Sequence, residues 1–90
     1  MKGMYRVLAR AEEVGFDVAL PEPGAAGILR VQDTTRDLPV AVVNVSNRGA
    51  VTGGHGWAPG RRVVRFTGRY KDEQVCELLQ RYDRTLKEVI

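Results

Sequence analysis

The residues with the clearest chemical character lie between positions 48 and 71 of this 90-residue chain. The segment has six basic side chains and no acidic one: Arg48, Arg61, Arg62, Arg65, Arg69 and Lys71. Trp57, Phe66 and Tyr70 are interleaved with them. Guanidinium groups bind phosphate through two parallel hydrogen bonds, and aromatic rings stack on exposed bases. The segment therefore predicts a surface that contacts DNA or RNA.

A glycine-rich stretch inside this segment, residues 53–60 (GGHGWAPG), contains His55 and Trp57. We expect a loop here, with both side chains at the edge of the contact surface, because closely spaced glycines let the backbone approach a ligand. The stretch lacks the spacing and the Lys-Ser/Thr ending of a phosphate-binding P-loop. The alternative interpretation is a plain connection whose Trp57 folds back to cover the core.

Three functions follow from these residues. The first is a small non-enzymatic nucleic-acid-binding module, which would also suit an accessory protein of a phage or plasmid. The second is a protein-binding modulator, an inhibitor or adaptor, whose arginines meet an acidic partner and whose Trp57 is the anchor. The third is a ribonuclease, which would need His55, the only histidine of the chain, as its general acid or base.

Composition narrows the class of protein further. A mass of 10.0 kDa gives room for one domain, residues 1–90, and a hydrophobic fraction of 43% is that of a globular chain. The single cysteine, Cys76, excludes an intramolecular disulfide and a multi-cysteine zinc site, and no motif indicates a cofactor or metal. Because no apolar run reaches the ~20 residues of a membrane span and the first residues do not form a secretory signal, we predict a cytoplasmic protein.

The hydrophobic pattern predicts the elements that position these side chains. Apolar residues at three- and four-residue spacing predict helices over residues 2–14 and 72–90, with Gly15 after the first and Asp72 as N-cap of the second. Alternating or β-branched runs predict strands over residues 16–20, 27–33, 40–46, 50–52 and 61–68. In the last strand, Val64 and Phe66 share one face and Arg65 points to the other.

Short connections between consecutive strands favour an antiparallel sheet. We therefore predict an α+β two-layer sandwich, in the order helix, antiparallel sheet of three to five strands, helix, with both helices on one face of the sheet. The other face is then open to solvent, and a partner would bind there. Tyr82 and the terminal Val89 and Ile90 raise a further hypothesis, a homodimer formed through the C-terminal helix.

The order helix, glycine-aromatic pair, strand in LARAEEVGFDVAL, about 13 residues, resembles the start of two families. These are the small HicA-type ribonuclease toxins and the double-stranded-RNA-binding domains, which share a helix–three strands–helix arrangement. The toxins place a histidine directly after their first strand, whereas here Leu20 leads into Pro-Glu-Pro-Gly. The RNA-binding domains begin their last helix with basic residues, whereas here Asp72 and Glu73 occupy that place.

Overall fold

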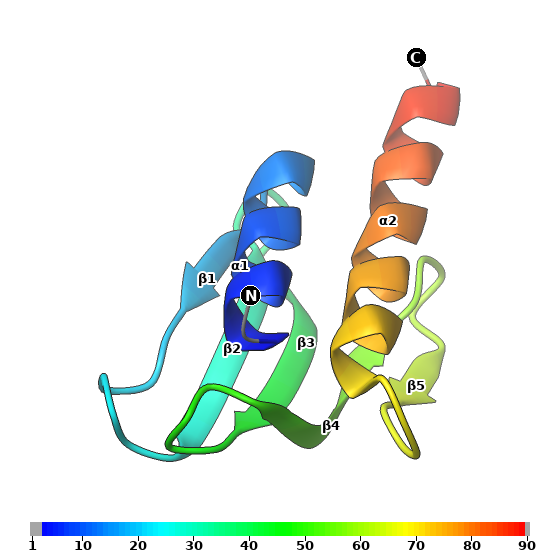
Figure 1. Cartoon of the computed structure of the whole chain (residues 1–90). Helices are drawn as coiled ribbons and strands as arrows, with labels where there is room; N and C mark the ends of the chain where they lie inside the picture. Colours follow the sequence, from blue (N-terminus) through cyan, green and yellow to red (C-terminus); the bar gives the residue numbers. More distant parts are fainter. Residues whose placement is uncertain (1–2, 90) are drawn as a thin grey trace.

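Along the chain, one helix precedes and one follows a run of five strands, as the sequence predicts (Figure 1). The structure is a computed structural model that describes residues 3–89, and it describes side chains for residues 3–83. Its elements are α1 (Gly3–Val14), β1 (Asp17–Ala19), β2 (Gly27–Asp33), β3 (Leu38–Val45), β4 (Val51–Trp57), β5 (Val63–Arg65) and α2 (Lys71–Val89). None of the helices in this range is long and apolar enough to cross a lipid bilayer.

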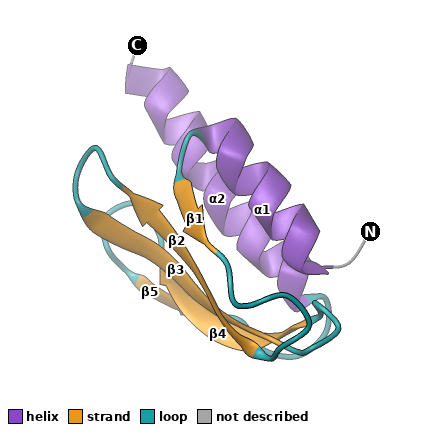
Figure 2. Ribbon diagram, turned by 90° about the vertical axis from the view of Figure 1, so that its left-hand side faces the viewer, coloured by secondary structure: helices purple, strands orange, loops and turns teal. Residues whose placement is uncertain are grey.

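The five strands form one sheet in the order β1-β2-β3-β4-β5, and each is antiparallel to the next. Both helices lie side by side on the same face of this sheet, and Figure 2 shows no described element on the opposite face. The α+β sandwich with both helices on one face is therefore confirmed. Because consecutive strands are neighbours throughout, any charge bias along the sequence becomes a charge bias across the sheet.

The core lies between the helix layer and the sheet. Val7 and Ala11 of α1 are fully buried, as are Val75 and Leu79 of α2. They cover a sheet surface that includes Leu29 of β2, and burying a side chain of this size contributes about 1.5–3 kcal/mol to folding. The apolar stripes of both helices thus face the core, as their spacing predicts.

The end of α1 has the geometry that the sequence predicts. Gly15 has a φ of 95°, and its N–H donates to the carbonyl of Glu12 at 3.1 Å. The N–H of Phe16 donates to the carbonyl of Ala11 at 2.9 Å, so the helix ends in a Schellman motif. This turn directs the chain into β1 and places the Phe16 ring in the core.

The loop expected at residues 53–60 is wrong for residues 53–57, which belong to β4, whereas residues 58–60 do form a turn. The glycines permit contacts that a side chain would block. A Cβ atom on Gly56 would lie 2.5 Å from Leu78 Cδ2 of α2, and one on Gly54, whose φ is 132°, would lie 2.3 Å from the carbonyl oxygen of Val42. Close packing of strand against helix and strand against strand, rather than an open anion-binding loop, therefore accounts for these residues.

Several element boundaries also differ from the prediction, and those around β5 and α2 differ as follows. The last strand is Val63–Arg65, shorter than residues 61–68, because Arg61 and Gly68 on either side have positive φ angles of 69° and 76°. Asp72 is not the N-cap of α2, since the helix begins at Lys71. Its carboxylate instead accepts a hydrogen bond from the Arg6 guanidinium at 2.8 Å, which joins the two helices.

Candidate functional site

The face of the sheet opposite the helices, called the open face below, is built by strand alternation. In β2 the buried residues Leu29 and Val31 point to the helices, so their neighbours Ile28 and Arg30 point away and are exposed. Strand pairing carries this alternation across the sheet. The open face consists of Asp17, Ala19, Ile28, Arg30, Gln32, Val42, Asn44, Gly53, His55, Trp57, Val63 and Arg65.

One cross-strand row contains His55 with one arginine on each side of it. Arg30 pairs with Val42, Val42 with His55, and His55 with Arg65. Directly paired side chains in an antiparallel sheet have Cβ atoms roughly 5 Å apart, so the row spans roughly 14 Å. Arg30 and Arg65 are both exposed, while Val42 and His55 between them are half-buried.

Trp57 lies beside this row, two residues along β4 from His55. The two rings meet edge to face, with centroids 5.1 Å apart and planes at 76°. The guanidinium carbon of Arg61 lies 5.1 Å from the Trp57 ring centroid, within the range of a cation–π interaction. The half-buried indole thus has an imidazole and a guanidinium as neighbours.

Contacts at the end of β4 hold this group in place. Arg61 Nη1 donates to the carbonyl oxygen of Pro39 at 2.8 Å, which ties the β4–β5 hairpin to β3. The Tyr82 hydroxyl of α2 donates to the carbonyl oxygen of Trp57. Because the backbone at Trp57 is bonded to the helix layer, the indole sits on a rigid part of the sheet.

The predicted site residues fall into two groups. His55, Trp57, Arg61 and Arg65 come together on or beside the open face, and exposed Arg62 lies in the same β4–β5 hairpin as Arg61.

Arg48, Arg69 and Lys71 lie at the opposite end of the sheet. Arg48 is in the β3–β4 turn, and Arg69 and Lys71 line a surface hollow beside Val51, at the start of β4. Lys71 Nζ donates to the carbonyl oxygen of Gly68 at 2.7 Å. The basic segment is thus divided between two ends of the molecule.

Arg30 is the residue of this site that the sequence prediction missed. It lies in the half of the chain that has five bases and six acids, outside the basic segment. Alternation in GILRVQD places it on the face opposite Leu29, which is a signal available from sequence. Only the register of four strands shows that it shares a row with His55 and Arg65.

The arginines of the helix layer form ion pairs, which distinguishes them from those of the open face. The Arg6 guanidinium lies 2.8 Å from the carboxylate of Asp72 and 3.7 Å from that of Glu73. Arg10 lies 3.6 Å from Glu13.

In contrast, Arg30, Arg62 and Arg65 make no ion pair with any residue whose side chain the structure describes. Residues 38–71, which form β3, β4, β5 and their hairpins, contain no acidic side chain. Acidic groups do lie at the β1 edge, where Asp17 pairs with Gln32 and Asp37 accepts a hydrogen bond from Gln32 at 3.4 Å. The positive charge of the open face is therefore concentrated toward β4 and β5.

The described residues offer little for covalent or metal chemistry. Burial raises the pKa of the half-buried Cys76 thiol, which disfavours the nucleophilic thiolate. No three His, Cys, Asp or Glu side chains within residues 3–83 gather as metal ligands would. His55 contacts Trp57, and no carboxylate of that range hydrogen-bonds to it to orient the imidazole.

No protein-family model matches the chain, and no curated protein or solved structure is significantly similar to it. The resemblance to HicA-type toxins and double-stranded-RNA-binding domains thus covers only the first helix and strand. The sheet has five strands rather than three, Leu20 follows β1, and His55 lies in β4.

The C-terminal dimer predicted from the sequence concerns three residues. Tyr82 is buried within this chain and packs edge to face on Phe16, with ring centroids 5.3 Å apart. The side chain of Val89 and the whole of Ile90 lie outside the described residues. Tyr82 is thus already covered by its own chain.

Proposed function

We propose that this protein binds single-stranded nucleic acid across the open face and catalyses no reaction. The observation that carries the proposal is the cross-strand row of Arg30, His55 and Arg65, with Trp57 packed against His55 beside it. Aromatic rings stack on bases of any sequence, and guanidinium groups neutralise the phosphates between them. The cytoplasmic location predicted from the sequence is part of this proposal.

A single strand suits this surface better than a duplex does. Duplex DNA is read by a helix or a two-stranded ribbon that enters the major groove, and its bases are stacked on one another. The open face presents side chains of a broad sheet instead, with the Trp57 ring half-buried among its neighbours. Single-stranded bases can be splayed onto such a surface, and sheets that bind RNA in this way stack two or three bases.

Trp57 provides the measurement, since it is the only tryptophan of the chain. We expect its fluorescence to be quenched on titration with ten-nucleotide oligo-dT or oligo-U at 50 mM salt. If about three phosphates are neutralised, the logarithm of the binding constant falls against the logarithm of the salt concentration with a slope of about −2. Absence of saturable binding to either oligonucleotide at 50 mM salt contradicts the proposal.

Matched arginine variants locate the surface. Arg65→Ala and Arg30→Ala should each weaken oligonucleotide binding about five- to tenfold, because each removes a charge-assisted phosphate contact. Arg48→Ala removes the same charge at the exposed turn on the far end of the sheet and should change affinity less than about twofold. Equal losses in all three variants would mean attraction to net charge alone. Binding of an acidic protein that depends on Arg65 and Trp57, without oligonucleotide binding, would favour the protein-binding modulator.

A further inference from the structure

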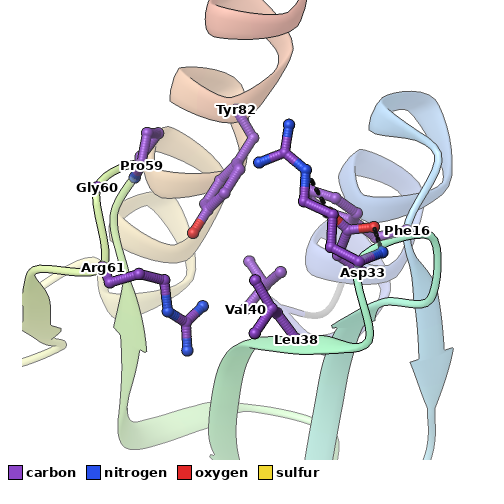
Figure 3. Close-up of a pocket in the computed structure, with 9 residues that line it drawn as sticks. Phe16, Asp33, Leu38, Val40, Pro59, Gly60, Arg61 and Tyr82 are labelled. Carbon is purple, nitrogen blue, oxygen red and sulfur yellow. Dashed lines mark hydrogen bonds and ion pairs between the residues drawn. The ribbon is translucent and has the colours of Figure 1, made fainter.

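A second feature lies at the end of the sheet where Arg61 projects. A cavity of about 220 Å³, called the end cavity below, opens between α2 and the β2–β3 and β4–β5 hairpins. Figure 3 shows Pro59 on one side of it, Asp33 on the other, and Leu38 and Val40 at its base, while the contacting rings of Phe16 and Tyr82 form a shared wall. It is a hollow of the helix side, distinct from the open face.

The walls of the end cavity are largely apolar. The rings of Phe16 and Tyr82 meet edge to face, at 83°. Val40 at the base is 1% exposed. The Tyr82 hydroxyl already donates to the carbonyl oxygen of Trp57, so the polar end of this side chain is satisfied and its ring remains as a wall. Such walls favour an apolar or aromatic ligand body.

Two arginines from different hairpins, Arg36 and Arg61, line the same cavity. Burial raises the pKa of the Tyr82 hydroxyl, and the positive charges of Arg61 and Arg36 act to lower it. Figure 3 shows the Arg61 side chain extending into the space below the Tyr82 hydroxyl. A ligand in the end cavity would therefore lie beside two guanidinium groups.

The one carboxylate of the cavity is already engaged. Asp33 accepts hydrogen bonds from the backbone N–H groups of Thr35, at 3.1 Å, and Arg36, at 3.3 Å. Its other oxygen lies 3.8 Å from Arg36 Nε. Arg61 uses one terminal nitrogen for the carbonyl of Pro39 and has further N–H donors. Because Arg36 and Arg61 face a single carboxylate, that of Asp33, the mouth of the cavity has an excess of positive charge.

We infer that the end cavity binds a small organic carboxylate, with its apolar body against Tyr82, Phe16 and Val40 and its carboxylate held by Arg61 and Arg36. Guanidinium groups match a carboxylate through paired N–H donors. The volume lies below the roughly 300–1,000 Å³ of drug-sized pockets. At about 30 Å³ for each water-sized group, it holds roughly seven non-hydrogen atoms, such as the seven carbons of a benzoate whose two oxygens lie against the guanidinium groups at the mouth.

Trp57 would report on this ligand, because it touches two of the groups that form the cavity. Arg61 stacks on its ring, and Tyr82 bonds to its carbonyl. A carboxylate that draws the Arg61 guanidinium into the cavity changes the surroundings of the indole. This inference depends only on the cavity and holds whether or not the open face binds nucleic acid.

Benzoate is the probe, and benzamide is its neutral counterpart of the same shape. We expect benzoate to shift the backbone amide resonances of Val40, Gly60 and Tyr82 in a saturable manner, with a Kd of about 1–10 mM. Benzamide and inorganic phosphate should each bind at least about tenfold more weakly, because one lacks the charge and the other the apolar body. Equal binding of benzoate and benzamide, or of benzoate and phosphate, would overturn the inference, as would the absence of shifts with 50 mM benzoate.

Arginine variants test the anchor. Arg36→Met and Arg61→Met each keep an apolar stem and remove the guanidinium, and each should weaken benzoate binding at least about fivefold. Arg48→Met, at the far turn, is the matched control and should bind benzoate as the unmodified protein does. If Arg61→Met perturbs the hairpin, Arg36→Met decides alone, since its side chain bonds only within its own turn. Unchanged binding in both cavity variants would place the ligand elsewhere.

Discussion

Arginines of the helix layer and of the open face have opposite surroundings. Arg6 and Arg10 of α1 lie against carboxylates, and Arg6 joins α1 to α2 through Asp72. Arg30 and Arg65 on the open face meet no carboxylate among the side chains of residues 3–83. Both groups reach solvent, so exposure does not separate them. Ion pairing with carboxylates does separate them, and it indicates which arginines connect the helices and which are available to a ligand.

The difference originates in the sequence and is preserved by the topology. Acidic residues occur in both helices and around β1 and β2, and residues 38–71 have none. In a sheet whose strands follow one another in order, an acid-free stretch of sequence becomes an acid-free region of the surface. A sheet with crossover connections would have mixed these strands with the acidic ones.

We expect the greatest change from a substitution that pushes β4 away from β3 and so disrupts the sheet that forms the open face. Gly54→Ala should lower the free energy of unfolding by about 3 kcal/mol, because the new Cβ meets the Val42 carbonyl oxygen at 2.3 Å and the φ of 132° is strained for alanine. Gly53→Ala is the control, since its Cβ approaches only Asn44 Nδ2, at 3.9 Å. Urea denaturation measures both, and equal losses would show that β4 does not pack as described.

The next effect concerns the aromatic residue of the open face. Trp57→Ala should weaken single-strand binding about tenfold or more, because stacking contributes about 1–3 kcal/mol for each base. Tyr70→Ala removes an aromatic ring that is 70% exposed in the β5–α2 loop and should change affinity less than about twofold. Fluorescence anisotropy of a labelled oligonucleotide measures both variants. Equal effects would remove the distinction between the open face and the rest of the surface.

Two arginine substitutions, one in the helix layer and one on the open face, should have opposite effects on stability and on oligonucleotide affinity. Arg6→Ala should lower the free energy of unfolding by about 0.5–1 kcal/mol, the range of exposed ion pairs, and leave oligonucleotide affinity unchanged. Arg65→Ala should change stability by less than about 0.5 kcal/mol, as unpaired surface residues do, while affinity falls. Urea denaturation and oligonucleotide titration are performed on both proteins. A fall in affinity with Arg6→Ala as large as that with Arg65→Ala contradicts the assignment.

The smallest effect is a pH dependence of stability that belongs to the helix layer. Burial raises the pKa of Cys76 above its usual 9.0 and that of Tyr82 above its usual 10.0. As pH rises, the unfolded chain loses these protons before the folded protein does, so unfolding becomes easier above about pH 9 and the contribution is intact below it. Urea midpoints at pH 7 and pH 10.5 measure the fall. It should be smaller in Cys76→Ala, and an unchanged midpoint in the unmodified protein contradicts the burial of these groups.

Local patterns determine how much of the fold the sequence predicts. Residues 27–33 are predicted as a strand with the observed bounds, because Leu29 and Val31 alternate with polar or exposed neighbours. The two helices follow from their apolar stripes. The strand through His55 and Trp57 is missed because its glycines have the composition of a loop, and their reason for being there, contact with Leu78 and Val42, is tertiary.

The candidate site is harder to predict for the same physical reason. Composition finds Arg65 and Trp57, but it groups them with Arg48 and Arg69, which the antiparallel path of β4 and β5 carries to the other end of the sheet. Composition also omits Arg30, whose place in the same row as His55 depends on the register of two strand pairs, β2–β3 and β3–β4. Pairing across strands, which sequence spacing does not encode, decides which charges meet.

Backbone amide chemical shifts recorded while a ten-nucleotide oligo-U is added show whether nucleic acid binds to the open face. We expect the largest changes at Arg30, Val42, His55, Trp57 and Arg65, across strands that are distant in sequence. Changes confined to the helix layer, or to the turns that hold Arg48 and Arg69, would contradict binding at the open face.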